Sequence, residues 1–529
     1  MELPACFLPN RGLPALLFLL WIVAGGAGCG PEADPPEVPV DVPVPALPEI
    51  SAVPDAAKLE SESWHAIYIQ KHHVGYGHYR RYSWTTKIGL RTKWLSEMVL
   101  AIKQGEKSIS QRLELASEDN DQGEMQTCDM KMAVGASPLL LHVDRKGDML
   151  EVVSSSAGRT ARSSMEWPAA AGGIFAPEQS MLAKPLQPGE VRKVSILFPG
   201  HGTLEKGEAT LRAQQYEMTY LLEGQKELLR IEFDTSTAGQ TVRQLLWADR
   251  QGEVLKASHQ ALEQTVYRTS KERAMASEGQ APTFDITAAS TVRVTFPAGN
   301  PHSTTRALYK VRLREGDPAK VFPQGASQQV RRLDDHAAEI TVIAIRPTEP
   351  EKVDSHGDRT PTDNDLAPNQ LLQTDEPNVI QLAMQAGANE TDPWKLAVAL
   401  EELVRSRMRR TPNSQAFASA AEVARTFQGD CTEHGVLLAA LLRARKIPAR
   451  VAIGLVYHGP SGGFAFHLWT EAWIKDRWVP LDATLARGGI GAAHLKITDS
   501  DLAGANATSA FLPVLQVMGQ MEAEVIEVK

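Results

Sequence analysis

Residues 427–450 read FQGDCTEHGVLLAALLRARKIPAR. A Gly-Asp pair interrupts the chain before Cys431, and the apolar residues from there to Leu442 have the spacing of an α-helix. Cys431 therefore stands at a predicted helix N-terminus, where unpaired backbone N–H groups and the helix dipole favour a thiolate over a thiol. Its backbone N–H is also a candidate donor to an oxyanion formed beside the sulfur. A small buried hydrophobic residue is the alternative interpretation of a free cysteine at this place.

Two further stretches, FAFHLWTEAWI (464–474) and RWVPLDATL (477–485), alternate as strands around a tight turn at Lys475-Asp476. In an antiparallel hairpin with Ile474 opposite Arg477, Trp469 faces Asp482. His467 and Asp482 are then diagonal neighbours on one face, within side-chain reach of each other. A slip of one residue would place them on opposite faces.

A cysteine helix packed on that face would complete a nucleophilic site. We assign Cys431 as the nucleophile on an acyl carbon and His467 as the base that takes its proton and later protonates the leaving group. Asp482 would orient the imidazole and stabilise its charged form.

The segments GDCTEHGVLLAALLRARKIPARVAIGLVY, HLWTEAWI and RWVPLDAT resemble the transglutaminase-like core of bacterial proteins in the papain-like cysteine superfamily. The resemblance covers about residues 377–500 and includes the order Cys, His, Asp, the Ile-Pro-Ala-Arg entry into a strand and the tryptophan before the aspartate. It implies a cysteine helix on an antiparallel sheet and a triad of Cys431, His467 and Asp482 that acts on amide bonds of peptides or proteins. It implies no metal or organic cofactor.

The reaction itself does not follow from the resemblance. Members of this superfamily are transglutaminases, proteases or peptide amidases, and some have lost the triad. Hydrolysis and acyl transfer therefore both remain candidate activities, and a catalytically silent surface binding or scaffold protein is the alternative. All three triad residue types are present here, which favours an enzyme.

Three neighbours of Cys431 have roles to test. Gln428 is a candidate second oxyanion donor, or else a loop residue. Glu433 in the first helical turn is expected to stabilise the helix dipole. His434 suggests a Cys-x-x-His zinc site completed by the His–Asp pair, although a metal there would occupy the nucleophile.

The predicted fold class is multidomain α+β, with an antiparallel β-rich N-terminal region followed by a transglutaminase-like α+β domain. Apolar runs separated by Gly-containing turns, as in VDRKGDML, WADRQGEVL and YEMTYLLEGQKELLRIEF, indicate β-hairpins. The expected divisions are a signal peptide (1–28), a Pro-rich tether (29–58), a β-rich domain (59–282), a second β module or extension of it (283–346), a linker (347–376) and the transglutaminase-like domain (377–529).

The N-terminus has the pattern of an export signal. RGLPALLFLLWIVAGGAGCG (11–30) contains one arginine, a short apolar stretch and small residues before Cys29. GAGC resembles a bacterial lipobox, in which the cysteine carries the lipid, so we expect a cell-envelope lipoprotein that faces the periplasm or the cell surface. Plain secretion and an uncleaved anchor are the alternatives. The proline-rich residues that follow are typical of an extended tether.

Composition excludes other classes. A net charge of −9 over 529 residues argues against a nucleic-acid partner. The four cysteines have no disulfide-framework spacing, and a Cys128–Cys431 bridge would have to join two predicted domains. His72, His73 and His78 do not predict a metal site, because adjacent histidines on a strand point to opposite faces.

Overall fold

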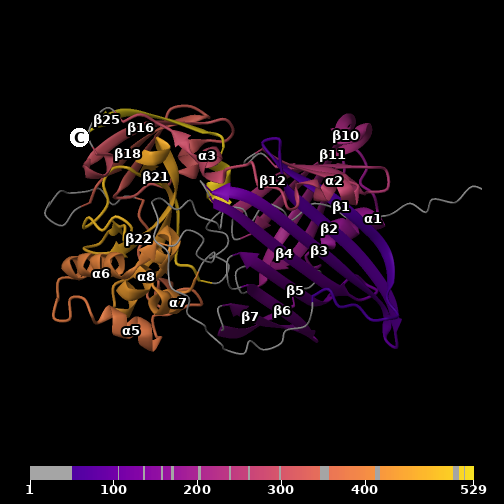
Figure 1. Cartoon of the computed structure of the whole chain (residues 1–529), viewed down its shortest axis with the longest axis horizontal. Coiled ribbons are helices and arrows are strands. Elements are labelled where there is room, and N and C mark those ends of the chain that lie inside the picture. Colours follow the sequence, from indigo (N-terminus) through magenta and orange to yellow (C-terminus); the bar gives the residue numbers. More distant parts are fainter. Residues whose placement is uncertain are drawn as a thin grey trace, which may run out of the picture. The chain divides into compact units, whose positions relative to one another are not determined.

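The structure, a computed structural model, describes most of the chain beyond the N-terminal segment. The described residues are 50–104, 107–134, 138–156, 159–167, 172–199, 204–237, 240–259, 263–296, 300–345, 357–410, 418–503, 512–517 and 519–529. The predicted signal peptide and Cys29 lie outside them. No helix in this described part combines the length and apolar character needed to cross a bilayer. The chain divides into two compact units, principally between Phe284 and Asp285 (Figure 1).

The N-terminal unit is built on one sheet of 14 strands, in the order β8-β7-β6-β5-β4-β3-β2-β1-β14-β13-β12-β11-β10-β9. Two meanders therefore meet where β1 pairs antiparallel with β14. The strands are β1 (Lys58–Ile69), β2 (His72–Thr86), β3 (Gly89–Gln104), β4 (Lys107–Asp119), β5 (Met125–Val134), β6 (Leu139–Lys146), β7 (Met149–Ser156), β8 (Arg159–Glu166), β9 (Val191–Pro199), β10 (Leu204–Leu221), β11 (Gly224–Thr237), β12 (Gln240–Ala248), β13 (Val254–His259) and β14 (Gln264–Thr269). The unit also contains α1 (Ala176–Ala183), α2 (Lys271–Ala274) and η3 (Met275–Ser277).

The predicted hairpins form because glycine supplies the turn conformation. Gly147 and Gly252 have φ values of 64° and 81°, in the left-handed region that only glycine adopts without strain. The third hairpin turns at residues 222–223, since Leu221 pairs with Gly224. One buried face of β6 shows the expected alternation, with Leu139, Leu141 and Val143 in the core.

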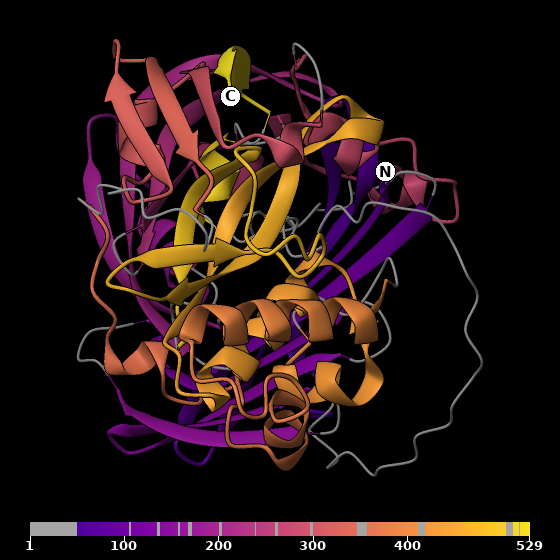
Figure 2. The same ribbon diagram turned by 90° about the vertical axis from the view of Figure 1, so that its left-hand side faces the viewer.

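The C-terminal unit combines helices with two main sheets, of order β15-β22-β21-β24 with β23 on β22, and β17-β18-β16-β25. Figure 2 shows the orange helices gathered beside the strands of the first sheet. The strands are β15 (Val292–Arg293), β16 (Arg306–Leu313), β17 (Gln328–Arg332), β18 (Ala337–Ile343), β19 (Arg409–Arg410), β20 (Gln428–Gly429), β21 (Ala449–His458), β22 (Gly463–Trp473), β23 (Trp478–Leu481), β24 (His494–Ser500) and β25 (Met521–Val528). The helices are α3 (Ile286–Ser290), η4 (Pro301–Ser303), α4 (Pro318–Val321), η5 (Asp363–Asp365), α5 (Pro377–Ala383), α6 (Pro393–Arg407), α7 (Ala420–Thr426), α8 (Cys431–Ala444), η6 (Gly459–Ser461) and α10 (Leu512–Val517).

Segments that the sequence analysis assigned to separate domains pair with each other in this unit. β16 pairs with β25 along its length, and β15 pairs with β22, so residues 285–345 share both sheets with the C-terminal segment. The described part of the predicted linker is also packed. Arg359 forms a bidentate contact of 2.6 and 2.8 Å with buried Asp365. The backbone carbonyl of Arg359 accepts a 2.7 Å hydrogen bond from Trp478 Nε1.

The helix that carries Cys431 lies directly on β22. A Cβ at Gly435 would come within 2.3 Å of Leu468 Cδ2, so glycine allows the close approach. Thr470 Oγ1 donates a 2.9 Å hydrogen bond to the Gly435 carbonyl. Cys431, one helical turn before Gly435, is thereby brought to the part of β22 that contains His467.

Candidate active site

The helix begins at Cys431, as the Gly-Asp interruption predicts. Asp430 is the N-cap and accepts a 2.8 Å hydrogen bond from the Thr432 N–H. Glu433 closes a capping box by accepting a 3.0 Å hydrogen bond from the Asp430 N–H. Glu433 thus contacts the start of the helix, and its expected effect on the helix dipole stays a prediction. Cys431 is 6% exposed.

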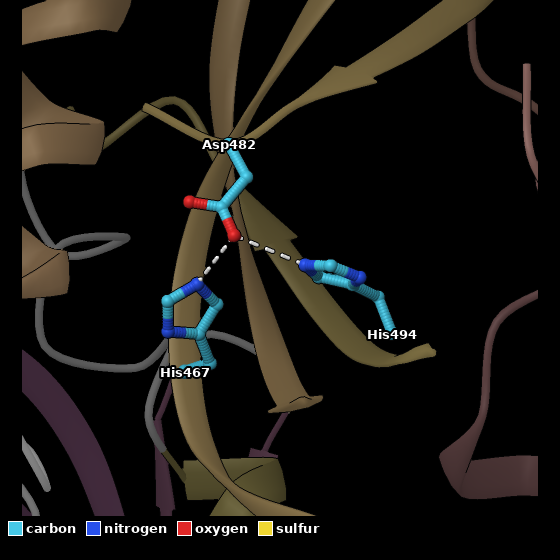
Figure 3. A group of neighbouring side chains, drawn as sticks. All are labelled: His467, Asp482 and His494. Atoms are coloured by element: carbon cyan, nitrogen blue, oxygen red, sulfur yellow. Dashed lines mark hydrogen bonds and ion pairs between the residues drawn. The ribbon is translucent and has the colours of Figure 1, made fainter. Parts of the chain in front are cut away.

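The hairpin of β22 and β23 has the register that the alternation predicts. Trp473 pairs with Trp478, and Ile474 N donates to the Arg477 carbonyl at 3.0 Å. This register brings His467 and Asp482 onto one face, where His467 Nε2 lies 2.9 Å from Asp482 Oδ2 (Figure 3). Both residues are buried, at 7% and 1% exposure.

The Asp482 carboxylate is saturated with hydrogen-bond donors. Its Oδ1 accepts from the Thr484 N–H at 2.8 Å and from Thr484 Oγ1 at 2.5 Å. Its Oδ2 accepts from His467 and also from His494 Nε2 at 3.1 Å. Burial alone would raise the pKa of Asp482, but the two histidines, through their charges when protonated and their hydrogen bonds, outweigh it and hold this pKa well below its usual range. Asp482 is therefore ionised.

The thiol is a weaker acid than its place at a helix N-terminus suggested. Burial raises the pKa of Cys431 well above its ordinary value, and the nearby carboxylates of Asp430, Glu433 and Asp482 add to the increase. A backbone hydrogen bond from Leu468, the residue after His467, acts in the opposite direction. The sulfur thus lies against the strand that holds the imidazole, and it is a neutral thiol until a base takes its proton. Within the described part of the chain, neither Cys431 nor Cys128 forms a disulfide.

Glu401 on α6 is a site residue that the sequence interpretation missed. Its carboxylate is fully buried and accepts hydrogen bonds from the Asp482 N–H at 2.8 Å and the Gly488 N–H at 2.9 Å. Burial raises the pKa of Glu401 to about 7. A signal existed in the sequence, because this acidic residue shares the helical spacing of the apolar residues Leu400 and Val404.

The other residues that the sequence analysis singled out near Cys431 are Gln428 and His434. Gln428 on β20 has an exposed side chain, and its oxyanion role stays a prediction. His434 Nδ1 hydrogen-bonds to the Asp430 carbonyl at 2.5 Å. Among the described residues, the potential metal-ligand atoms that lie within 4.8 Å of one another come from His467, Asp482 and His494, a set that includes neither His434 nor Cys431. Two imidazoles and a carboxylate could hold a divalent transition-metal ion.

The fold and the site together define a cysteine helix on an antiparallel sheet, with a His–Asp pair on the adjacent hairpin. Residues 380–483 match the family model of the transglutaminase-like superfamily. The C-terminal unit therefore carries a transglutaminase-like domain, and the matched stretch contains Cys431, His467 and Asp482.

Solved structures give further similarities. A candidate cysteine protease from Cytophaga hutchinsonii is 18% identical, with 43% of this chain and 86% of that chain covered and a TM-score of 0.27. A candidate protease from Parabacteroides distasonis is 15% identical, with 53% and 64% covered and a TM-score of 0.18. A structure described as a TGase is 12% identical, with 48% and 65% covered and a TM-score of 0.16. No curated protein matches the chain.

Proposed function

We propose that this protein is a thiol enzyme that cleaves or exchanges amide bonds of peptide or protein substrates through Cys431, His467 and Asp482. The observation that carries the proposal is the 2.9 Å hydrogen bond between His467 Nε2 and Asp482 Oδ2. Because Asp482 is ionised, Nε2 must carry the proton, which leaves Nδ1 as the acceptor for the thiol proton. The match of residues 380–483 to the transglutaminase-like superfamily supports the same assignment.

In the proposed reaction, His467 Nδ1 takes the thiol proton as the sulfur attacks the substrate carbonyl carbon. A C–S bond forms and the carbonyl oxygen becomes an oxyanion, for which the Cys431 N–H is one donor and Gln428 a candidate second. The imidazolium then protonates the leaving amine as the C–N bond breaks, and a thioester remains on Cys431. Asp482 stabilises the imidazolium throughout.

Water or an amine then resolves the thioester. We favour water, because it is abundant outside the cell and amine transfer requires a site that excludes it. The test incubates the protein with a mixed peptide library and excess primary amine, followed by mass spectrometry. Free acid products are expected from the wild type and none from Cys431→Ala. Amine adducts would overturn hydrolysis in favour of transfer, and the same products from both proteins would overturn the thiol mechanism.

We also propose that the enzyme is exported and held at the membrane by a lipid on Cys29, facing the periplasm or the cell surface. The support is the apolar stretch with small residues before Cys29 and the proline-rich segment after it. Metabolic labelling with a fatty acid should mark the wild type but not Cys29→Ser. An unlabelled wild type would remove the lipid and leave plain secretion or an uncleaved anchor.

One observation favours the second candidate function, a silent surface binding or scaffold protein. Cys431 is 6% exposed, and its pKa is raised rather than lowered. A buried neutral thiol with no working base would be inert. The two functions differ in whether His467 activates the thiol, which the rate of Cys431 alkylation in His467→Ala measures.

A further inference from the structure

His494 is a second histidine on the carboxylate of Asp482. It begins β24, is 2% exposed, and places Nε2 3.1 Å from the same Oδ2 atom that His467 contacts. Figure 3 shows both imidazoles, from different strands, directed at this one oxygen. His494 lies outside residues 380–483, so the family match does not include it.

The electrostatics determine which way these hydrogen bonds run. Asp482 is ionised, so its Oδ2 can only accept and both imidazoles donate from Nε2. Burial lowers the pKa of His494 and the hydrogen bond to Asp482 partly opposes this, so His494 is a neutral donor. With two donors on Oδ2 and two from Thr484 on Oδ1, the carboxylate cannot rotate without losing hydrogen bonds.

We propose that His494 is a positioning residue of the triad, an inference that rests on the proposed function. Its hydrogen bond fixes the direction in which Asp482 Oδ2 faces His467, and by sharing the negative charge it leaves the proton on His467 Nε2. The imidazole of His467 is thereby kept in the tautomer whose Nδ1 can accept a proton from Cys431. His494 thus joins Cys431, His467 and Asp482 in the proposed chain of contacts that activates the thiol.

The position of His494 is itself built by residues 300–309. The Ala492 N–H donates to the Thr304 carbonyl at 3.0 Å, and Tyr309 donates to the Ala492 carbonyl at 2.5 Å. At Gly491, a Cβ would lie 2.2 Å from the carbonyl oxygen of His302, so only glycine fits there. This segment belongs to the predicted second β module (283–346), so that module holds the backbone just before His494 in place.

Two further rings pack against the imidazole of His494. The His302 ring stands edge-on to the His494 ring, with centroids 6.0 Å apart, and burial lowers the pKa of His302 to about 4. Trp469 also lies edge-on at 5.3 Å. These two rings pack against His494, whose Nε2 hydrogen-bonds to Asp482 Oδ2 at 3.1 Å.

The test compares His494→Leu, which fills the volume without a donor, with His494→Gln, whose side-chain N–H can replace Nε2. The readout is the second-order rate of Cys431 alkylation by iodoacetamide at neutral pH in the full-length protein. We expect a loss of about 10- to 100-fold in His494→Leu, the size of one hydrogen bond to a charged group. His494→Gln should stay within about threefold of the wild type, and His458→Gln, on the same sheet, is the matched control.

Rescue by glutamine separates positioning from packing. Equal losses in both variants, or a wild-type rate in His494→Leu, would overturn the inference. One zinc per chain in purified wild type that is lost in both His494 variants would also overturn it and make His494 a metal ligand. If His467→Ala itself alkylates at the wild-type rate, the proposed function fails first, which distinguishes the two failures. Where a product assay is established, the same variant should lower kcat with KM nearly unchanged.

Discussion

His467→Ala is expected to slow the alkylation of Cys431 by iodoacetamide at neutral pH by about 100-fold or more, the scale of general-base assistance. Burial and the carboxylates around Cys431 raise its pKa well above the ordinary value, so without a base very little thiolate exists at neutral pH. The sign of the pH dependence follows from this increase. In His467→Ala the rate should keep rising with pH beyond pH 9, whereas the wild type should react at neutral pH.

The chain contains an internal control for this measurement. Cys128 on β5 is a free, buried thiol whose pKa is also raised by burial, and it should label slowly in every variant. His458→Ala, on the neighbouring strand β21, is the matched substitution and should leave the rate at Cys431 unchanged. Equal rates in the wild type and His467→Ala would show an ordinary buried thiol and favour the silent scaffold.

Asp482→Asn is expected to lower kcat by about 10⁴-fold with the fold intact, the effect known for a wrong histidine tautomer in such triads. The asparagine side chain has one oxygen, whereas both carboxylate oxygens of the aspartate accept hydrogen bonds. The Thr484 N–H is fixed in the backbone and retains the oxygen, so the amide N–H₂ then faces His467 and His494. His467 must then accept at Nε2 and carry its proton on Nδ1, facing the thiol.

The measurement is steady-state product formation on the best peptide found by mass spectrometry, with near-ultraviolet circular dichroism to verify packing. Asp476→Asn, at the exposed turn of the same hairpin, is the control and should retain wild-type kcat. A kcat for Asp482→Asn within about threefold of the wild type would contradict the tautomer argument and the role of Asp482.

The parts of the site that could be predicted depend on local rules. The Gly-Asp interruption located the start of α8, because a helix needs a cap and a polar N-terminus. The register of His467 and Asp482 followed from a two-residue turn and strict alternation, because the strand period of two leaves only one face for both. The antiparallel β-rich class of the N-terminal unit followed from apolar runs that are repeatedly separated by glycine turns, which is also a local pattern.

The parts that could not be predicted depend on partners distant in the chain. Glu401 reaches Asp482 across 81 residues, and Tyr309 fixes the residues before His494 from 183 residues away. No periodicity within one segment encodes such a contact. The raised pKa of Cys431 was missed for a related reason, since the helix N-terminus is a local feature while burial and nearby carboxylates come from packing.

By itself, then, the sequence determined the cysteine helix, the His–Asp hairpin and the transglutaminase-like character of the C-terminal domain, since capping and alternation act over a few residues. Only the tertiary structure decided that a second histidine shares Asp482, that Glu401 holds its backbone and that residues 300–309 support the site. Those contacts exist because folding buries a carboxylate, and a buried charge must collect donors from whichever strands and helices pack around it.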